Sequence, residues 1–157
     1  MTTSSGDGDE AIVNHVGLCV TDLDRSRHFY QDVLGFVSVR ELTVPDAAAG
    51  PLLSIDAPVE LTAVYLERGS FVLELLHFGR PENPPAAPRP FNQPGLTHLS
   101  FSVPDLEACV ALVPGAGGTV VTQFGRAAAI IRDPDGQLLE LLPPSYRRNL
   151  NKPPADT

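Results

Sequence analysis

Apolar residues recur at every second position in several short stretches of this 157-residue chain, and that spacing predicts β-strands. Two stretches have helical spacing instead. Thr21 or Asp22 can cap the first of these helices and Gly35 can end it, and the second begins near Asp105. The predicted strands cover residues 12–20, 36–44, 59–67, 70–78, 96–103, 119–124, 127–132 and 137–142, and the predicted helices cover about 22–34 and 105–113.

The second half of the chain repeats the plan of the first. The segment NHVGLCVTDLDRS at 14–26 matches THLSFSVPDLEAC at 97–109. Between the two copies, residues 80–95 contain six prolines, which do not fit a helix interior or a sheet ladder. We therefore expect two βαβββ modules that form one domain. The expected organisation is a tail (1–11), module one (12–79), a proline-rich linker (80–95), module two (96–143) and a second tail (144–157).

Three connections within the modules carry further expectations. Residues 46–58 form a long stretch without periodicity, and we expect a loop there that could act as a lid. Arg68 and Gly69 are predicted to form a tight hairpin turn between two strands. The sequence Asp-Pro-Asp-Gly at 133–136 is typical of a turn, because proline fixes φ and glycine accepts a positive φ.

Strand alternation divides the side chains of each module between two faces. The strongly apolar face should pack on a helix. The opposite face carries one metal-binding group on each of four strands, and these groups are His15, Glu74, His98 and Glu140. A buried carboxylate costs several kcal/mol unless it is paired or bound to a metal. Two imidazoles and two carboxylates suit a divalent cation and leave positions open for substrate, so we expect a metal site.

The overall composition excludes several other classes of function. The net charge is −8, with 11 Lys and Arg against 19 Asp and Glu, which disfavours binding to nucleic acids and to anionic membranes. No apolar run approaches the length of a membrane span, and residues 1–10 do not have the pattern of a signal peptide. Cys19 and Cys109 are too few for a disulfide framework, so we expect reduced thiols and a cytoplasmic protein.

Four motifs in order resemble the vicinal oxygen chelate superfamily, and most closely glyoxalase I-like and methylmalonyl-CoA epimerase-like members. They are HVGLCVTDLDRSRHFYQDVLGF, VLELLHF, THLSFSVPDLEAC and DPDGQLLELL, and together they cover nearly all of residues 12–142. The resemblance implies an α+β fold in which two βαβββ modules form a half-open mixed β-barrel around one divalent metal. Carried over by position, the implied ligands are His15, Glu74, His98 and Glu140. Many members are homodimers that complete the site between subunits, whereas related epimerases complete it within one chain.

The resemblance also implies a reaction, which is proton transfer at a carbon next to a metal-chelated carbonyl through an enediolate. Glu140 is the expected base, and Glu74 is its partner on the opposite side of the substrate. The ligand set permits Ni, Co, Zn, Mn, Fe or Mg.

Three positions are expected to line the substrate pocket, and they are Cys19, Phe78 and Ser100. Glutathione-dependent glyoxalases hold an Arg and an Asn where Cys19 and Phe78 stand here, and neither of these side chains can pair with a carboxylate. We therefore expect a small-molecule substrate other than glutathione, such as a coenzyme A ester, another thiol adduct or an aromatic compound.

Three alternatives stay open at this point. The first is an extradiol-type dioxygenase, which would use His15, His98 and Glu140 around Fe(II). The second is a non-catalytic antibiotic-binding protein of the bleomycin-resistance type. The third is a member of the superfamily that keeps these residues only as two buried His–Glu pairs.

Overall fold

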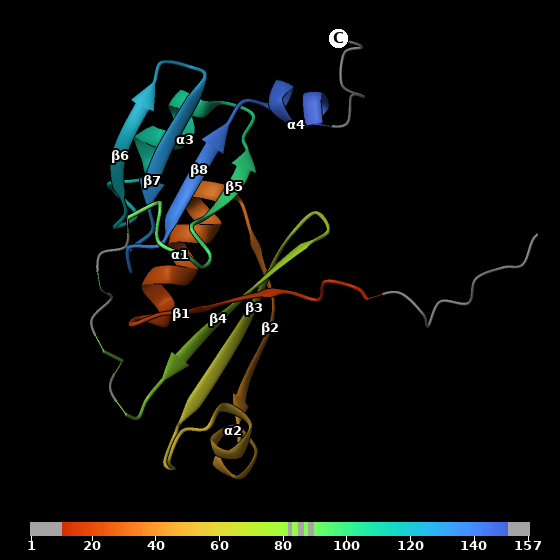
Figure 1. Ribbon diagram of the computed structural model, residues 1–157, viewed down its shortest axis with the longest axis vertical. Helices are drawn as coiled ribbons and strands as arrows, with labels where there is room; N and C mark the ends of the chain where they lie inside the picture. The colour runs from red at the N-terminus through yellow and green to blue at the C-terminus, as the bar shows by residue number, and fades with distance from the viewer. Residues whose placement is uncertain (1–10, 82, 85–86, 88–89, 151–157) are drawn as a thin grey trace, which may run out of the picture.

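The structure is a computed structural model that describes residues 11–81, 83–84, 87 and 90–150, without the side chains of 148–150. Its strands form two separate four-stranded sheets that do not close into a barrel (Figure 1). The first sheet consists of β1 (Val16–Cys19), β2 (Val37–Val44), β3 (Leu61–Arg68) and β4 (Phe71–Phe78). The second consists of β5 (His98–Ser102), β6 (Thr119–Phe124), β7 (Ala128–Arg132) and β8 (Leu138–Leu142).

Both sheets have the same topology, which confirms the predicted α+β fold of two repeated modules. The strand orders are β1-β4-β3-β2 and β5-β8-β7-β6. In each sheet the first strand, β1 or β5, lies at one edge and is parallel to its neighbour, and the other strand pairs are antiparallel. The register places Glu74 opposite Gly17, and Glu140 opposite Ser100. The two glutamates therefore occupy equivalent positions on the strand next to the edge.

Four helices accompany the sheets, namely α1 (Leu23–Leu34), α2 (Asp46–Leu53), α3 (Leu106–Leu112) and α4 (Pro144–Leu150). Asp22 and Asp105 cap α1 and α3, since each side chain accepts a hydrogen bond from the backbone N–H three residues later. Gly35 ends α1 in the left-handed conformation with φ of 68°. These three ends agree with the sequence prediction.

The larger of two hydrophobic clusters spans both modules. The apolar residues of β1, β4, β5 and β8 pack with those of α1 and α3, and Phe29 on α1 is fully buried. α1 and α3 contact each other, so each sheet covers one side of a shared helical layer. At Gly118, an added Cβ would lie 2.5 Å from the ring of Phe29, which leaves room there only for glycine. The apolar faces of the strands point to the helices, as alternation predicts.

The Asp-Pro-Asp-Gly turn of module two docks on α1 of module one. Asp135 accepts hydrogen bonds from the side chains of Thr21, Arg25 and Ser26, at 2.9 Å from Arg25 Nη2 and 3.1 Å from Ser26 Oγ. Asp133 is only 4% exposed and accepts a hydrogen bond from the Tyr30 phenol at 2.8 Å. These contacts hold the modules together at a point where the sequence predicts only a turn.

Three segments differ from the sequence prediction. Residues 12–15 lie outside β1, which is shorter than the predicted strand at 12–20. Residues 46–53 form α2 instead of the predicted loop, because Ala49 packs with Val59 and Leu61 in a small separate core. Residues 144–150 form α4 where a tail is predicted, and α4 contacts β5.

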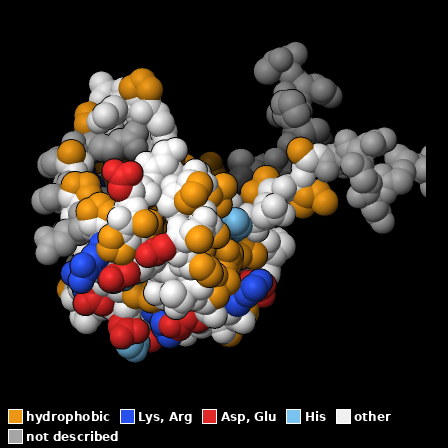
Figure 2. Space-filling model, turned by 90° about the horizontal axis from the view of Figure 1, so that it is seen from below, with side chains coloured by type: hydrophobic (Ala, Val, Ile, Leu, Met, Phe, Trp, Pro, Cys, Tyr) orange, Lys and Arg blue, Asp and Glu red, His pale blue; other side chains and the backbone are white. Residues whose placement is uncertain are grey.

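Figure 2 shows acidic and basic side chains interspersed over the face seen from below. Across the described residues, no helix is both long and apolar enough to cross a membrane. Cys19 and Cys109 are free thiols, Cys19 exposed and Cys109 buried.

We predict that Asp133→Asn reduces the pH dependence of stability. Burial raises the pKa of Asp133, although hydrogen bonds from Tyr30 and from the backbone of Gln137 and Asp135 oppose this shift. A raised folded-state pKa favours the protonated form, so the stabilisation is complete below the ordinary pKa of 3.8 and is lost as pH rises through the folded value. Asparagine keeps an acceptor for the backbone N–H groups and cannot ionise.

The melting temperature of Asp133→Asn at pH 7 should therefore equal or exceed that of the wild type, with a flatter profile between about pH 4 and 7. Asp24→Asn is a matched control, because the Asp24 side chain is 81% exposed. A lower melting temperature for Asp133→Asn at every pH would contradict this account.

Candidate metal centre

The first half-site lies at the edge of the first sheet. His15 immediately precedes β1, and Glu74 is at the middle of β4, where its side chain is 13% exposed. His15 Nε2 lies 3.1 Å from Glu74 Oε2. Gly17 on β1 is the register partner of Glu74, and a Cβ at position 17 would be in ordinary van der Waals contact with Glu74 Oε2, at 3.6 Å.

Tyr65 on β3 supports this half-site from the other side of β4. It pairs with Glu74 in the sheet register, and its ring meets the His15 ring edge-on at a centroid separation of 5.7 Å. The hydrogen bond from the Tyr65 phenol to Glu74 raises the pKa of Tyr65, with smaller contributions from burial and the charge of Glu74. The Glu74 carboxylate is thus oriented by two aromatic neighbours.

The second half-site has the same plan in the second sheet. His98 begins β5 and Glu140 is at the middle of β8, with 3.7 Å between His98 Nε2 and Glu140 Oε2. The Ser100 hydroxyl donates a hydrogen bond to Glu140 Oε2 at 2.7 Å. Thr97 Oγ1 lies 2.9 Å from His98 Nδ1, which leaves Nε2 facing Glu140. In metal sites, an oxygen at the second ring nitrogen commonly sets the orientation of a histidine ligand.

The donor atoms of each half-site fit two ligands of one divalent ion. Ligands about 2.1 Å from a metal and at right angles to each other are about 3 Å apart, close to the 3.1 Å between His15 and Glu74. The second pair is somewhat wider. A complete site needs more than two protein ligands, and within the described part of the chain no three His, Cys, Asp or Glu side chains lie close enough to hold an ion.

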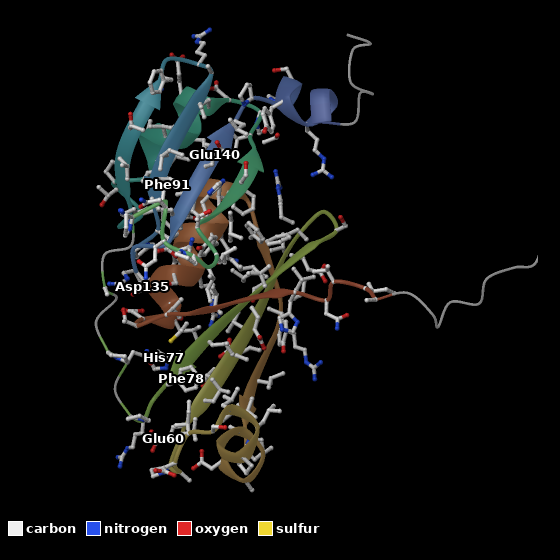
Figure 3. All side chains as sticks on the ribbon, viewed as in Figure 1. Glu60, His77, Phe78, Phe91, Asp135 and Glu140 are labelled. Carbon is white, nitrogen blue, oxygen red and sulfur yellow. The ribbon has the colours of Figure 1, made fainter. Side chains whose placement is uncertain are left out.

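Each of the two half-sites therefore supplies two potential ligands, and one chain does not bring all four together. The half-sites belong to different sheets, and β1 and β5 are the outer strands of those sheets. Figure 3 shows Glu140 in the second sheet and Phe78, on the strand that also carries Glu74, in the first.

The three predicted pocket residues lie in three different surroundings. Cys19 lines a cavity of about 310 Å³ between β1 and the second module. Phe78, at the end of β4, packs against the small core beneath α2. Ser100 lines a cavity of about 620 Å³ that also contains His98 and Glu140.

Cys19 is suited to packing rather than to nucleophilic chemistry. Its thiol donates a weak hydrogen bond to Asn83 Oδ1 at 3.6 Å, and the Asn83 amide donates to the Val20 carbonyl at 2.9 Å. Partial burial, and secondarily the charge of Asp135, raise the pKa of Cys19, which favours the thiol over the reactive thiolate. The linker residue Asn83 is in this way attached to the end of β1.

Sequence reasoning does not identify Tyr65 as part of the first half-site, and the reason is the position of one turn. With a turn at Arg68–Gly69, residue 63 would lie opposite Glu74. In the structure Arg68 pairs with Phe71, so the turn falls at Gly69–Ser70 and Tyr65 is opposite Glu74. A single-residue change in the turn therefore decides whether an alanine or a phenol meets the carboxylate.

The fold and the paired half-sites define a protein of the glyoxalase type. The model of the Glyoxalase/Bleomycin resistance protein/Dioxygenase superfamily matches residues 12–141, and the chain belongs to this superfamily. The resemblance described from the sequence motifs is thereby confirmed.

Individual relatives extend over most of the chain. A lactoylglutathione lyase of Pseudomonas aeruginosa is 30% identical over 155 residues, which cover 91% of this chain and 88% of that protein. The uncharacterized protein YaeR of Escherichia coli K12 is 31% identical over 136 residues, 82% of this chain and 93% of YaeR. Glyoxalase I of Leishmania major, a trypanothione-dependent enzyme, has a TM-score of 0.67 at 26% identity, with 87% and 88% of the two chains covered. The family and these relatives indicate an enzyme.

Proposed function

We propose that this protein is a divalent-metal-dependent lyase or isomerase of the glyoxalase I type, which moves a proton at a carbon next to a carbonyl. One observation carries the proposal. Each module places an imidazole nitrogen beside a carboxylate oxygen, at 3.1 Å in one and 3.7 Å in the other, on equivalent positions of the repeat. Four such ligands on two matching strand pairs are the donor set that a divalent ion with open positions requires.

We further propose that two chains complete each site. The His15–Glu74 pair and the His98–Glu140 pair belong to different sheets, and each lies near a strand with no further partner on its outer side among the described residues. In a homodimer, module one of one chain can face module two of its partner. Each dimer would then hold two sites, and each site would contain two ligands from each chain.

The environments of the two glutamates support different roles. Glu74 is held by His15 and by the Tyr65 phenol, so its carboxylate is fixed in position. Glu140 is held by the small Ser100 hydroxyl and lies farther from its histidine. Glu140 is therefore the better candidate for the base, which would take the proton from the substrate carbon and return it to the neighbouring carbon. The Ser100 hydroxyl, bonded to Oε2, orients the Glu140 carboxylate.

The metal, when bound, supplies Lewis-acid stabilisation of the negative charge that develops on the substrate oxygens. The chain's own groups determine which substrate reaches that position. Cys19 and Phe78 provide no cationic group for the carboxylates of glutathione, so we propose a substrate other than glutathione. The P. aeruginosa relative supports the reaction class, since it is named for a lyase that acts on lactoylglutathione.

We predict that the purified protein binds one divalent ion per chain and that the four ligands contribute to its affinity. Glu74→Gln and Glu140→Gln should each weaken binding by more than about 100-fold, because loss of a mere supporting hydrogen bond already costs about 10- to 100-fold. Tyr65→Phe should weaken binding by about 10-fold, because it removes a hydrogen bond that supports the Glu74 ligand. Titration with Ni²⁺, Co²⁺, Zn²⁺ or Mn²⁺ in a calorimeter measures these values.

Glu67→Gln is the matched control for these variants, because Glu67 is an exposed glutamate on β3 and should not change the affinity. Stoichiometric binding that survives both Glu74→Gln and Glu140→Gln would contradict the proposed ligand set.

Mixing two inactive variants tests completion of the site by two chains. One chain carries His15→Ala with Glu74→Gln, and the other carries His98→Ala with Glu140→Gln. If the sites lie between chains, the mixed dimer contains one intact site and one site without ligands. We then expect metal binding to return to one ion per mixed dimer. Sites formed within single chains would give no recovery.

The reaction class is tested by proton exchange in D₂O. We expect deuterium to enter at the carbon next to the carbonyl of a hemithioacetal or a coenzyme A thioester, as observed by NMR. Glu140→Gln should slow the exchange by about 10²- to 10⁴-fold, the usual contribution of a general base, while its fold remains intact. Oxygen uptake with a catechol and Fe²⁺, without such exchange, would indicate a dioxygenase instead.

A further inference from the structure

The cavity that contains the second half-site also has two arginine side chains in its lining. This cavity has a volume of about 620 Å³ and is lined by His98, Ser100 and Glu140 as well as by residues outside the half-site. Among the latter are Arg68, at the end of β3, and Arg147, on α4. Its size is within the range of cavities that bind small organic molecules.

The charge inside this cavity is opposite to that of the whole chain. The chain has a net charge of −8, but the cavity lining contains two guanidinium groups and a single carboxylate, that of Glu140. Neither arginine forms an ion pair with any acidic side chain in the described part of the protein. Arginines without a carboxylate partner in a predominantly acidic protein are available to bind an external anion.

Arg68 is held in place before any ligand arrives. Its Nη1 donates a hydrogen bond to the Gly35 carbonyl at the end of α1, at 3.0 Å. A Cβ at position 35 would lie 3.0 Å from the same nitrogen, so the glycine both adopts a positive φ and leaves room for the guanidinium. One side of Arg68 is thus bound to the protein, and its remaining N–H groups stay available. Such a fixed guanidinium loses little conformational entropy when it binds an anion.

Two aromatic side chains contribute to the lining of the same cavity. Phe71 and Phe101 line the cavity, with ring centroids 6.0 Å apart in an edge-on arrangement. Phe101 alternates with His98 and Ser100 along β5, so its ring lies on the core side of this edge strand, and the cavity borders both faces of the strand. A ligand that fits this lining has an apolar part for the two rings and an anionic group for the two arginines.

We propose that this cavity binds the anionic end of the substrate, a carboxylate or a phosphate, through Arg68 and Arg147. The proposal rests on the proposed function, because it places the reacting carbonyl at the half-site of His98 and Glu140 and the anionic group at the arginines that line the same cavity. Phe71 and Phe101 then contact the part of the substrate between these ends. The substrate class is a carbonyl compound that carries an anionic group.

Binding of simple probes to the metal-free, full-length protein tests this proposal. Phenylacetate and phenyl phosphate carry the two kinds of anion, and benzyl alcohol is the neutral analogue of similar size. We expect both anions to bind at least about 10-fold more tightly than benzyl alcohol in an NMR titration, and to shift the imidazole signals of His98. The ratio of the two anion affinities tells whether a carboxylate or a phosphate fits better.

Arg147→Gln and Arg68→Gln should each weaken the anionic probes by about 10-fold and leave benzyl alcohol unchanged. Arg147→Lys should recover part of the loss, because lysine keeps the charge without the paired N–H groups. Arg126→Gln is the matched control, since Arg126 is an exposed arginine 2.7 Å from Glu107 and lies outside this cavity. Arg68→Gln also loses the bond to Gly35, so its melting temperature is measured alongside.

Equal affinity for the anionic and neutral probes, or anion binding that both arginine variants retain, would overturn the proposal. Because no metal is present in this experiment, its result is independent of the proposed reaction. Arginine-dependent anion binding in a protein that binds no metal would contradict the proposed function alone. Metal binding and proton exchange without a preference for anions would contradict the anionic subsite alone.

Discussion

The packing of the two modules through their helices is the constraint on which the rest of the structure depends. α1 and α3 share one hydrophobic core between the sheets, and the turn at Asp133–Gly136 is bonded to Arg25 and Tyr30 of α1. This arrangement uses the apolar face of both sheets inside a single chain. The opposite faces, which carry His15, Glu74, His98 and Glu140, are consequently left for another partner. The way the core is built therefore decides where the four ligands can meet.

Most of this arrangement follows from alternation in the sequence. A leucine precedes and follows both Glu74 and Glu140, so alternation predicts that each glutamate points away from the apolar face of its strand. In the structure those leucines are buried against the helices. The internal repeat predicts that the two pairs are equivalent, and the strand registers confirm it. Period-two patterns are reliable here because a shift of one residue would expose the entire apolar face.

The features that could not be predicted depend on contacts between distant residues. α2 has no amphipathic pattern, and its first residue, Asp46, accepts hydrogen bonds from the backbone N–H groups of Val59 and Glu60 at 3.0 Å. Tyr65 meets Glu74 only because the hairpin turns one residue later than its sequence indicates. The convergence of Arg68 and Arg147 on one cavity depends on α4, which a proline-containing tail does not suggest. In each case the local signal is weaker than the tertiary contact.

The repeat is symmetric in its backbone and asymmetric in the neighbours of its carboxylates, and this difference bears on how one site can perform two tasks. Opposite Glu74, the adjacent strands present Gly17 and Tyr65, whereas opposite Glu140 they present Ser100 and Ile130. A phenol restrains one carboxylate, and a small hydroxyl accompanies the other beside an apolar side chain. Two carboxylates with identical surroundings would share a proton or a metal equally, and neither would be favoured as the base. Divergence of the neighbours, with the glutamates themselves unchanged, would separate the proposed fixed ligand from the proposed base.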